Sequence, residues 1–246
     1  MEIRAGTSGY SYKEWRGDFY PAKIAPAEML AYYAQRLSAV EINNTFYRMP
    51  RRDVVESWAS SVPESFRFAV KVSQRITHRK RLAGVEEELD YLLAELAPLG
   101  ERLGLLLVQL PPNLPVDLAR LERFLDQLGA RARAAFEFRH ASWLDEPVLA
   151  CLRDRGAALV ASETDEMPAA LHETARFGYL RLRRTDYRPR DLADWLARVR
   201  VLSWDEAWVF FKHEASGPAL AAEFAGLAAR GRAIPVRGDE RAREVG

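Results

Sequence analysis

Eight short segments rich in β-branched and aromatic residues recur along the chain, and segments of helical periodicity separate most of them. The β-type segments are 3–7, 40–46, 66–72, 103–110, 134–139, 157–162, 177–182 and 207–211. The helical segments are 27–37, 54–60, 85–96, 118–128, 146–155, 192–199 and 220–229. Because parallel strands need long crossover connections, this alternation predicts an α/β protein with a parallel sheet. Eight such units favour a closed (β/α)8 barrel of the TIM type.

The predicted strands also have the composition of barrel strands. The segment 103–110, L-G-L-L-L-V-Q-L, is apolar on both faces, as a parallel strand buried on both sides should be. The sixth unit is the weakest, because 163–174 is short and contains Pro168. No linker of Gly, Ser or Pro divides the chain, so we expect one barrel domain, 1–236, with an irregular sixth unit and a charged tail, 237–246.

The charge balance and the single cysteine exclude several classes of protein. The formal net charge is +1, from 36 basic and 35 acidic residues, so no overall field favours nucleic acid or an anionic membrane. Cys151 lies in an apolar helical stretch and is expected to be a core residue. The N-terminus has no apolar signal region and no segment reaches the roughly 20 apolar residues that span a bilayer. We therefore expect a cytoplasmic protein with no membrane partner, while its oligomeric state stays open.

Polar residues gather at the predicted carboxyl ends of the strands. The stretch V-E-I-N-N-T-F-Y-R-M-P begins as an apolar strand, yet Glu41, Asn43 and Thr45 would share one face by the two-residue period. Ligand sites of (β/α)8 barrels lie at these strand ends and in the loops that follow them. Seven of the eight ends carry a titratable or cationic side chain, whereas the opposite ends are expected to lack them. This convergence predicts a polar site at one mouth of the barrel.

The residue types divide into candidate catalytic and candidate binding groups. Glu41, Lys71 and Glu137 are the candidate acid/base residues, and Lys71 is expected to pair with Glu41 or Glu137 because an isolated buried charge is costly. Each could equally be a structural ion pair. The candidate binding residues are Tyr10, Asn43, Thr45, Tyr47, His78, Gln109, Arg139, His140, Trp143, Arg181, Lys212, Ser216 and Gly217. No cofactor is predicted.

Five sequence blocks resemble those of a known family. They are T-S-G-Y-S-Y-K-E-W-R-G-D-F-Y-P, V-E-I-N-N-T-F-Y-R-M-P, F-R-F-A-V-K with the downstream I-T-H, L-L-L-V-Q-L-P-P, and F-E-F-R-H-A-S-W. In this order they are similar to the YecE-like proteins, a domain of unknown function, number seventy-two. The resemblance implies a TIM barrel and no established activity. Two departures occur, at residues 181–184, where the family has R-L-H-G, and at Lys212 and His213, where it has paired asparagines.

Two enzyme classes fit the residue types poorly. Divalent-metal ligands are present in Glu41, Glu137, Glu163, Asp165, His140 and His213. Lys71, Arg139, Arg181 and Lys212 are interleaved with them and raise the cost of adding a dication, so no metal site is assigned and a divalent-metal-dependent hydrolase or isomerase is kept as a less favoured alternative. A retaining glycosidase of the common barrel type would need carboxylates where strands four and seven offer Gln109 and Arg181. Glu41 and Glu137 could still form another acid/base pair across the barrel. A general base is easier to explain than a general acid, because the neighbouring cations would keep both carboxylates ionised.

Two binding hypotheses remain. The first is a small anion, such as a sugar phosphate or nucleotide, held by Arg139, Arg181 and Lys212 with a helix start at Ser216 and Gly217. The second is single-stranded nucleic acid, for which basic residues and aromatic stacking platforms would be needed. The candidates for it are the loop residues Arg75, His78, Arg79, Lys80 and Arg81 and the aromatic residues Tyr10, Tyr12, Trp15, Tyr47 and Trp143. The near-zero net charge favours the small anion.

Overall fold

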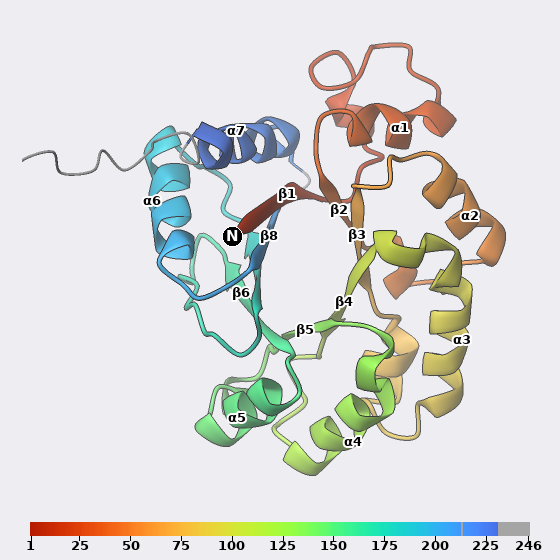
Figure 1. Ribbon diagram of the computed structural model, residues 1–246, viewed down its shortest axis with the longest axis vertical. Helices are drawn as coiled ribbons and strands as arrows, with labels where there is room; N and C mark the ends of the chain where they lie inside the picture. The colour runs from red at the N-terminus through yellow and green to blue at the C-terminus, as the bar shows by residue number, and fades with distance from the viewer. Residues whose placement is uncertain (213, 231–246) are drawn as a thin grey trace, which may run out of the picture.

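Eight parallel strands close into a barrel in the order β1 to β8 (Figure 1). The computed structural model describes residues 1–212 and 214–230. The strands are β1 (Glu2–Ser8), β2 (Ala39–Ile42), β3 (Arg67–Lys71), β4 (Leu103–Gln109), β5 (Ala134–Glu137), β6 (Ala158–Glu163), β7 (Phe177–Leu182) and β8 (Glu206–Phe211). Strand β1 pairs with both β2 and β8, which completes the circle. The predicted (β/α)8 fold is therefore confirmed.

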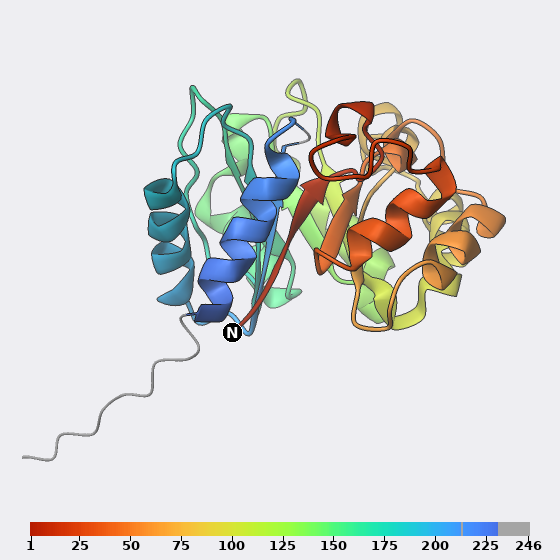
Figure 2. The ribbon, with the colours of Figure 1, turned by 90° about the horizontal axis from the view of Figure 1, so that it is seen from above.

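Helices cover the outside of this barrel (Figures 1 and 2). They are α1 (Met29–Ala34), α2 (Arg52–Ser60), α3 (Glu86–Leu96), α4 (Leu118–Leu128), α5 (Glu146–Asp154), α6 (Pro189–Arg200) and α7 (Gly217–Arg230). All seven coincide with segments of predicted helical periodicity. Residues 164–176, between β6 and β7, form no helix, as the Pro168 segment suggested. The predicted tail, 237–246, and His213 lie outside the described residues.

Strand β2 is shorter than the sequence pattern predicted. It ends at Ile42, and Asn43 turns the chain into a short 3-10 helix, Asn44–Phe46. The Thr45 Oγ1 hydroxyl donates to the carbonyl of Lys71 at 2.6 Å, so it ties this turn to β3. The expectation that Thr45 extends the inward face of the strand was therefore wrong, because polar side chains can end a strand by bonding to backbone groups.

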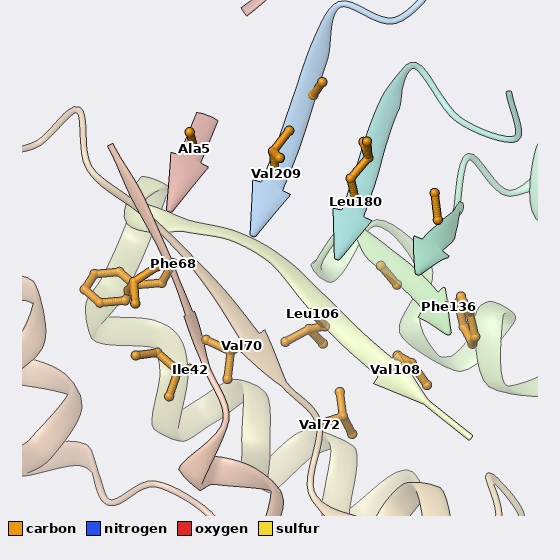
Figure 3. Packing of buried hydrophobic residues seen from close by; sticks show 14 of the residues in the cluster. Ala5, Ile42, Phe68, Val70, Val72, Leu106, Val108, Phe136, Leu180 and Val209 are labelled. Atoms are coloured by element: carbon orange, nitrogen blue, oxygen red, sulfur yellow. The ribbon is translucent and has the colours of Figure 1, made fainter. Parts of the chain in front are cut away.

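Alternating residues of each strand build two separate cores. The outward side chains, such as Ile42, Val70, Leu106 and Leu180, pack beneath the helices (Figure 3). The inward cluster consists of Ala39, Ala69, Leu105, Leu107, Ala135, Ala158, Val160, Phe177, Tyr179, Trp208 and Phe210. Gly104 makes room for one of the large inward rings, since a Cβ at this position would lie 2.0 Å from Trp208. The barrel interior is therefore filled by alternating small and large residues.

The amino-terminal ends of the strands also carry charges, which the sequence reasoning did not expect. Arg4, which is 8% exposed, pairs with Glu206. Arg133 contacts the second oxygen of Glu206 at 2.8 Å, and both guanidinium groups lie over the ring of Trp208. Every cation of this cluster has a carboxylate partner, so it closes the bottom of the barrel as a self-compensated network.

Two smaller expectations concern Cys151 and membranes. Cys151 is 4% exposed within α5, and burial raises the pKa of its thiol, which suits a core residue. Among the helices that the structure describes, none combines the length and apolar character needed to cross a bilayer.

Substitution of Gly104 tests how tightly the barrel interior is packed. We expect Gly104→Ala to lower the free energy of unfolding by about 1–3 kcal/mol, because the new methyl group would overlap the ring of Trp208. The same substitution at Gly226, where the nearest atom to an added Cβ is 3.8 Å away, should instead stabilise α7 by about 0.5–1 kcal/mol. Denaturant unfolding of both variants measures the difference, and equal effects would contradict the packing described.

Candidate functional site

The inward row of each strand becomes polar at its carboxyl end. On β7, for example, the inward residues run from Phe177 and Tyr179 to Arg181. The corresponding final inward positions of the eight strands, in order, are Ser8, Glu41, Lys71, Gln109, Glu137, Ser162, Arg181 and Lys212. The pleat of the strands therefore brings polar side chains to one mouth of the barrel, as predicted, but five of these eight are titratable or cationic where seven were expected, because Ser8 and Ser162 take the inward positions of β1 and β6.

Arg181 lies at the centre of this mouth and is 2% exposed. Its Nη2 donates to Glu41 Oε1 at 2.8 Å, and its Nη1 donates to Glu137 Oε2 at 2.6 Å. Burial alone would lower the pKa of Arg181, but the two carboxylates outweigh burial and raise it. One guanidinium therefore connects β7 with β2 and β5 across the barrel.

Glu41 is surrounded by hydrogen-bond donors. Besides Arg181, its Oε1 accepts from Ser8 Oγ and Asn43 Nδ2, both at 2.8 Å, and its Oε2 accepts from the Tyr179 hydroxyl at 2.7 Å. Burial raises the pKa of Glu41, but Arg181 and these hydrogen bonds outweigh burial and lower it to about 2. A carboxylate with that pKa is a poor proton acceptor at neutral pH, so this environment favours an anchoring role over the expected acid/base role.

Glu137 is the second carboxylate of the network and is 1% exposed. Its other oxygen, Oε1, contacts the guanidinium of Arg139, whose side chain is 32% exposed. Burial raises the pKa of Glu137, whereas Arg181 and Arg139 lower it, and the net shift is downward. Glu137 is thus held as an ionised acceptor between two arginines.

Lys71 does not make the ion pair expected from the sequence. Its Nζ donates to Gln109 Oε1 at 2.8 Å and lies 4.2 Å from the centre of the Phe46 ring. In the described part of the chain no carboxylate comes within ion-pair distance of it, because Arg181 has taken both glutamates. Burial, followed by the positive charge of Arg181, lowers the pKa of Lys71 to about 8. Lys71 is therefore a half-buried amine that titrates close to neutral pH.

Arg183 belongs to the site, as its place at the end of the seventh predicted strand indicated. It follows Arg181 by two residues at the end of β7, so the two side chains are expected on the same side of the chain. Its side chain is half-buried, and it forms no ion pair with any described carboxylate. Burial and the neighbouring Arg181 lower its pKa.

The loop after β8 satisfies its own polar groups. Lys212 Nζ pairs with Glu214 Oε1 at 2.8 Å, and Ser216 is exposed just before α7. A Cβ at Gly217 would lie 2.3 Å from the carbonyl oxygen of Lys212. The glycine is therefore required for close packing of the chain against itself, whether or not a ligand approaches.

The other candidate side chains lie around the mouth or outside it. Trp143 is fully buried, stacks on Phe138 with ring centres 4.6 Å apart, and donates its Nε1 to the carbonyl of Leu114. The expectation that Trp143 offers its ring to a ligand was wrong, and Trp15, 1% exposed, is likewise unable to serve as a stacking platform. The sequence could not separate these rings from exposed ones, because tertiary packing decides their burial.

Four remaining candidates keep some accessibility. His78 is half-buried with its ring 4.9 Å from that of Phe46, and burial and Lys71 lower its pKa. Tyr47 is 76% exposed at the rim. Tyr10 is half-buried and borders a 230 Å³ groove with Asn43. His140 shares a hydrogen bond with Ser142 Oγ at 2.8 Å.

Metal-type residues are dispersed by the fold. Glu163 accepts from Tyr187 and Trp195, while Asp165 accepts from the backbone of Thr185. Within residues 1–212 and 214–230, no three His, Cys, Asp or Glu side chains meet in a group that could hold a metal ion.

Glu88 neutralises part of the basic loop 75–81. Arg75 and Lys80 both pair with Glu88, at 2.9 and 2.8 Å. The cationic surface that single-stranded nucleic acid would meet is therefore smaller than the sequence suggested.

The fold and the mouth define a (β/α)8 barrel protein with a buried arginine–glutamate network at the carboxyl ends of its strands. The family model described as "Protein of unknown function DUF72" matches residues 4–243, and the chain belongs to this family. The UPF0759 protein YecE of Escherichia coli strain K12 is 33% identical over 109 residues, which cover 44% of this chain and 40% of that protein. The match thus spans well under half of the length of that curated relative.

Solved structures of the same family have the same fold. A DUF72 family protein from Thermotoga maritima MSB8 has a TM-score of 0.79 and 26% identity, over 93% of this chain and all of that chain. A DUF72 family protein from Enterococcus faecalis V583 has a TM-score of 0.74 and 23% identity, covering 95% of this chain and 96% of that chain. A D-allulose 3-epimerase from a Methylomonas species, with a TM-score of 0.58 and 14% identity over 93% of this chain and 97% of that chain, is similar in fold alone.

Removal of the central guanidinium tests the network. We expect Arg181→Met to lower the free energy of unfolding by about 3–5 kcal/mol, because two buried carboxylates would lose their shared partner. Arg139→Met removes a cation from the same glutamate at a more exposed position, so its cost should be below about 1 kcal/mol. Denaturant titration at neutral pH compares the two variants. Similar costs for both would show that Arg181 does not carry the network.

Proposed function

We propose that the barrel mouth binds a small polar anion between Lys71 and Arg183, and that Lys71 exchanges a proton with the bound molecule. The observation that carries this proposal is the presence of two half-buried cations without a carboxylate partner among the described residues. Unpaired charges at such depth are costly, and a bound anion would compensate them. This refines the small-anion hypothesis, in which Arg139, Arg181 and Lys212 were the expected contacts, by placing the anion between Lys71 and Arg183.

The charge balance of the mouth supports an anionic ligand. Four cations, Arg139, Arg181, Lys71 and Arg183, surround the carboxylates of Glu41 and Glu137, and these two carboxylates are already paired with arginines. Four positive charges against two negative charges leave an excess of two when Lys71 is protonated. Burial and Arg181 lower the pKa of Lys71 most, and Arg183 adds a smaller effect in the same direction. A dianionic group such as phosphate matches this excess.

Lys71 is better suited to proton transfer than Glu41. General acid/base catalysts work best when their pKa lies near the working pH, and the pKa of Lys71 is about 8, against about 2 for Glu41. Glu41 and Glu137 would then position Arg181 and accept hydrogen bonds from ligand hydroxyl groups. A sugar phosphate or a nucleotide combines such hydroxyl groups with an anion.

Calorimetric titration with glucose 6-phosphate, glucose and sulfate tests the proposal. We expect the two anions to bind and neutral glucose not to bind at the same concentration. Lys71→Met and Arg183→Met should each weaken anion binding about 10-fold or more, since each removes a charge-assisted hydrogen bond worth about 1.5–3 kcal/mol. Arg190→Met, at an exposed position on α6, is the matched control and should bind as the unmodified protein does.

Three outcomes would contradict the anion site. Equal affinities for glucose and glucose 6-phosphate would show that the charge of the ligand does not contribute to binding. Stabilisation only after addition of a divalent metal, abolished by a chelator, would favour metal-dependent chemistry. Binding only of single-stranded oligonucleotides, with a steep dependence on salt, would favour the nucleic-acid alternative.

The pH dependence of sulfate binding tests Lys71 separately. Its pKa in the free protein is about 8, so the cation is present below that pH and is lost above it. We expect the affinity for sulfate to fall about 10-fold as the pH rises from 7 to above 9, because one charge-assisted contact disappears. Sulfate does not titrate in this range, so the change reports the protein. Lys71→Met should show a flat profile over the same range, and an unchanged profile in the unmodified protein would contradict the assignment.

A further inference from the structure

The barrel wall opens between β5 and β6. These strands pair at only two positions, Ala135 with Ala158 and Phe136 with Leu159. Beyond them β5 ends at Glu137, whereas β6 continues to Glu163 and pairs there only with β7. The loop 164–176 follows β6 in place of a helix, and α5, which connects β5 with β6, packs on β6.

A cavity of about 260 Å³ occupies this opening. Leu159, Ala161 and Ala169 form its apolar wall, and Leu144 and Met167 stand at its rim with 61% and 55% of their surface exposed. Exposed large apolar side chains beside a pocket are a feature of ligand sites. An apolar cavity of about 150 Å³ is large enough for benzene, so this space admits one ring system with a substituent.

Polar atoms line the inner end of the cavity. Ser162 Oγ is buried and has no hydrogen-bond partner among the described residues. Across the opening, Glu137 is held ionised by Arg181 and Arg139, and its Oε1 contacts the Arg139 guanidinium. An unsatisfied buried polar atom is uncommon in folded proteins, and Ser162 Oγ therefore leaves a hydrogen bond for a ligand or water to complete.

We propose that this side pocket, between β5 and β6, binds a small planar ring that carries a hydrogen-bond donor directed at Glu137 and Ser162. The apolar wall and rim contact the ring. The ionised Glu137 can only accept, and the Ser162 hydroxyl can donate or accept, so a hydroxyl or amino substituent on the ring satisfies both. The pocket is distinct from the proposed anion site, which lies between Lys71 and Arg183, and ring binding does not require an anion.

Phenol is a probe of this chemistry, and toluene is its counterpart without a donor. Ligand-detected NMR titration should give saturable phenol binding in the millimolar range, as is ordinary for so small a ligand, and binding of toluene about 10-fold weaker. Ala170→Trp, which fills the pocket from an exposed lining position, should weaken phenol binding at least 10-fold. Ala229→Trp, at an exposed position near the end of α7, is the matched control and should leave phenol binding unchanged.

Ser162→Ala tests the polar end of the pocket without enlarging a side chain. This substitution should lower the affinity for phenol towards that for toluene, because it removes the Ser162 hydroxyl. The inference is overturned by the absence of saturable phenol binding, by equal affinity for phenol and toluene, or by equal binding to the protein and Ala170→Trp. Repeating the titration with saturating sulfate separates the two proposals, because phenol binding without sulfate binding would contradict only the anion site.

Discussion

The double ion pair of Arg181 with Glu41 and Glu137 is the interaction on which the rest of the mouth depends. It joins three strands that are not neighbours in the sheet. It therefore links opposite sides of the barrel, whereas backbone hydrogen bonds link only adjacent strands. It also keeps both carboxylates ionised in a buried setting. Because one arginine occupies both acceptors, Lys71 and Arg183 are left as the uncompensated cations of the site.

The two ends of the barrel use charge in different ways. At the amino-terminal end, Arg4 and Arg133 share Glu206 and lie over Trp208, so both of these cations have a carboxylate partner. At the carboxyl end, the cations outnumber the carboxylates. A self-compensated cluster contributes to the fold, whereas an excess of one sign near the surface favours binding of an oppositely charged ligand. Charged residues occur at both ends of the barrel, so it is the excess of unpaired cations that distinguishes the candidate site.

The irregular sixth unit changes the shape of the barrel. In a regular unit a helix would cover the outer face of β6, and the neighbouring strands would pair along their length. Here the short pairing of β5 with β6 and the loop 164–176 leave a cavity that reaches Glu137 from the side. Glu137 therefore borders both the central network and the side pocket.

The sequence by itself determined the eight-unit barrel and the inward direction of Glu41, Glu137 and Arg181, because alternation of side chains is a local property of a strand. It did not determine which charges pair. That choice depends on which strands face each other across the barrel and how far each side chain reaches, so Lys71 was assigned to a glutamate that Arg181 holds. Burial of Trp143 and the early end of β2 at Ile42 were likewise decided by contacts between segments distant in sequence, which only the tertiary structure brings together.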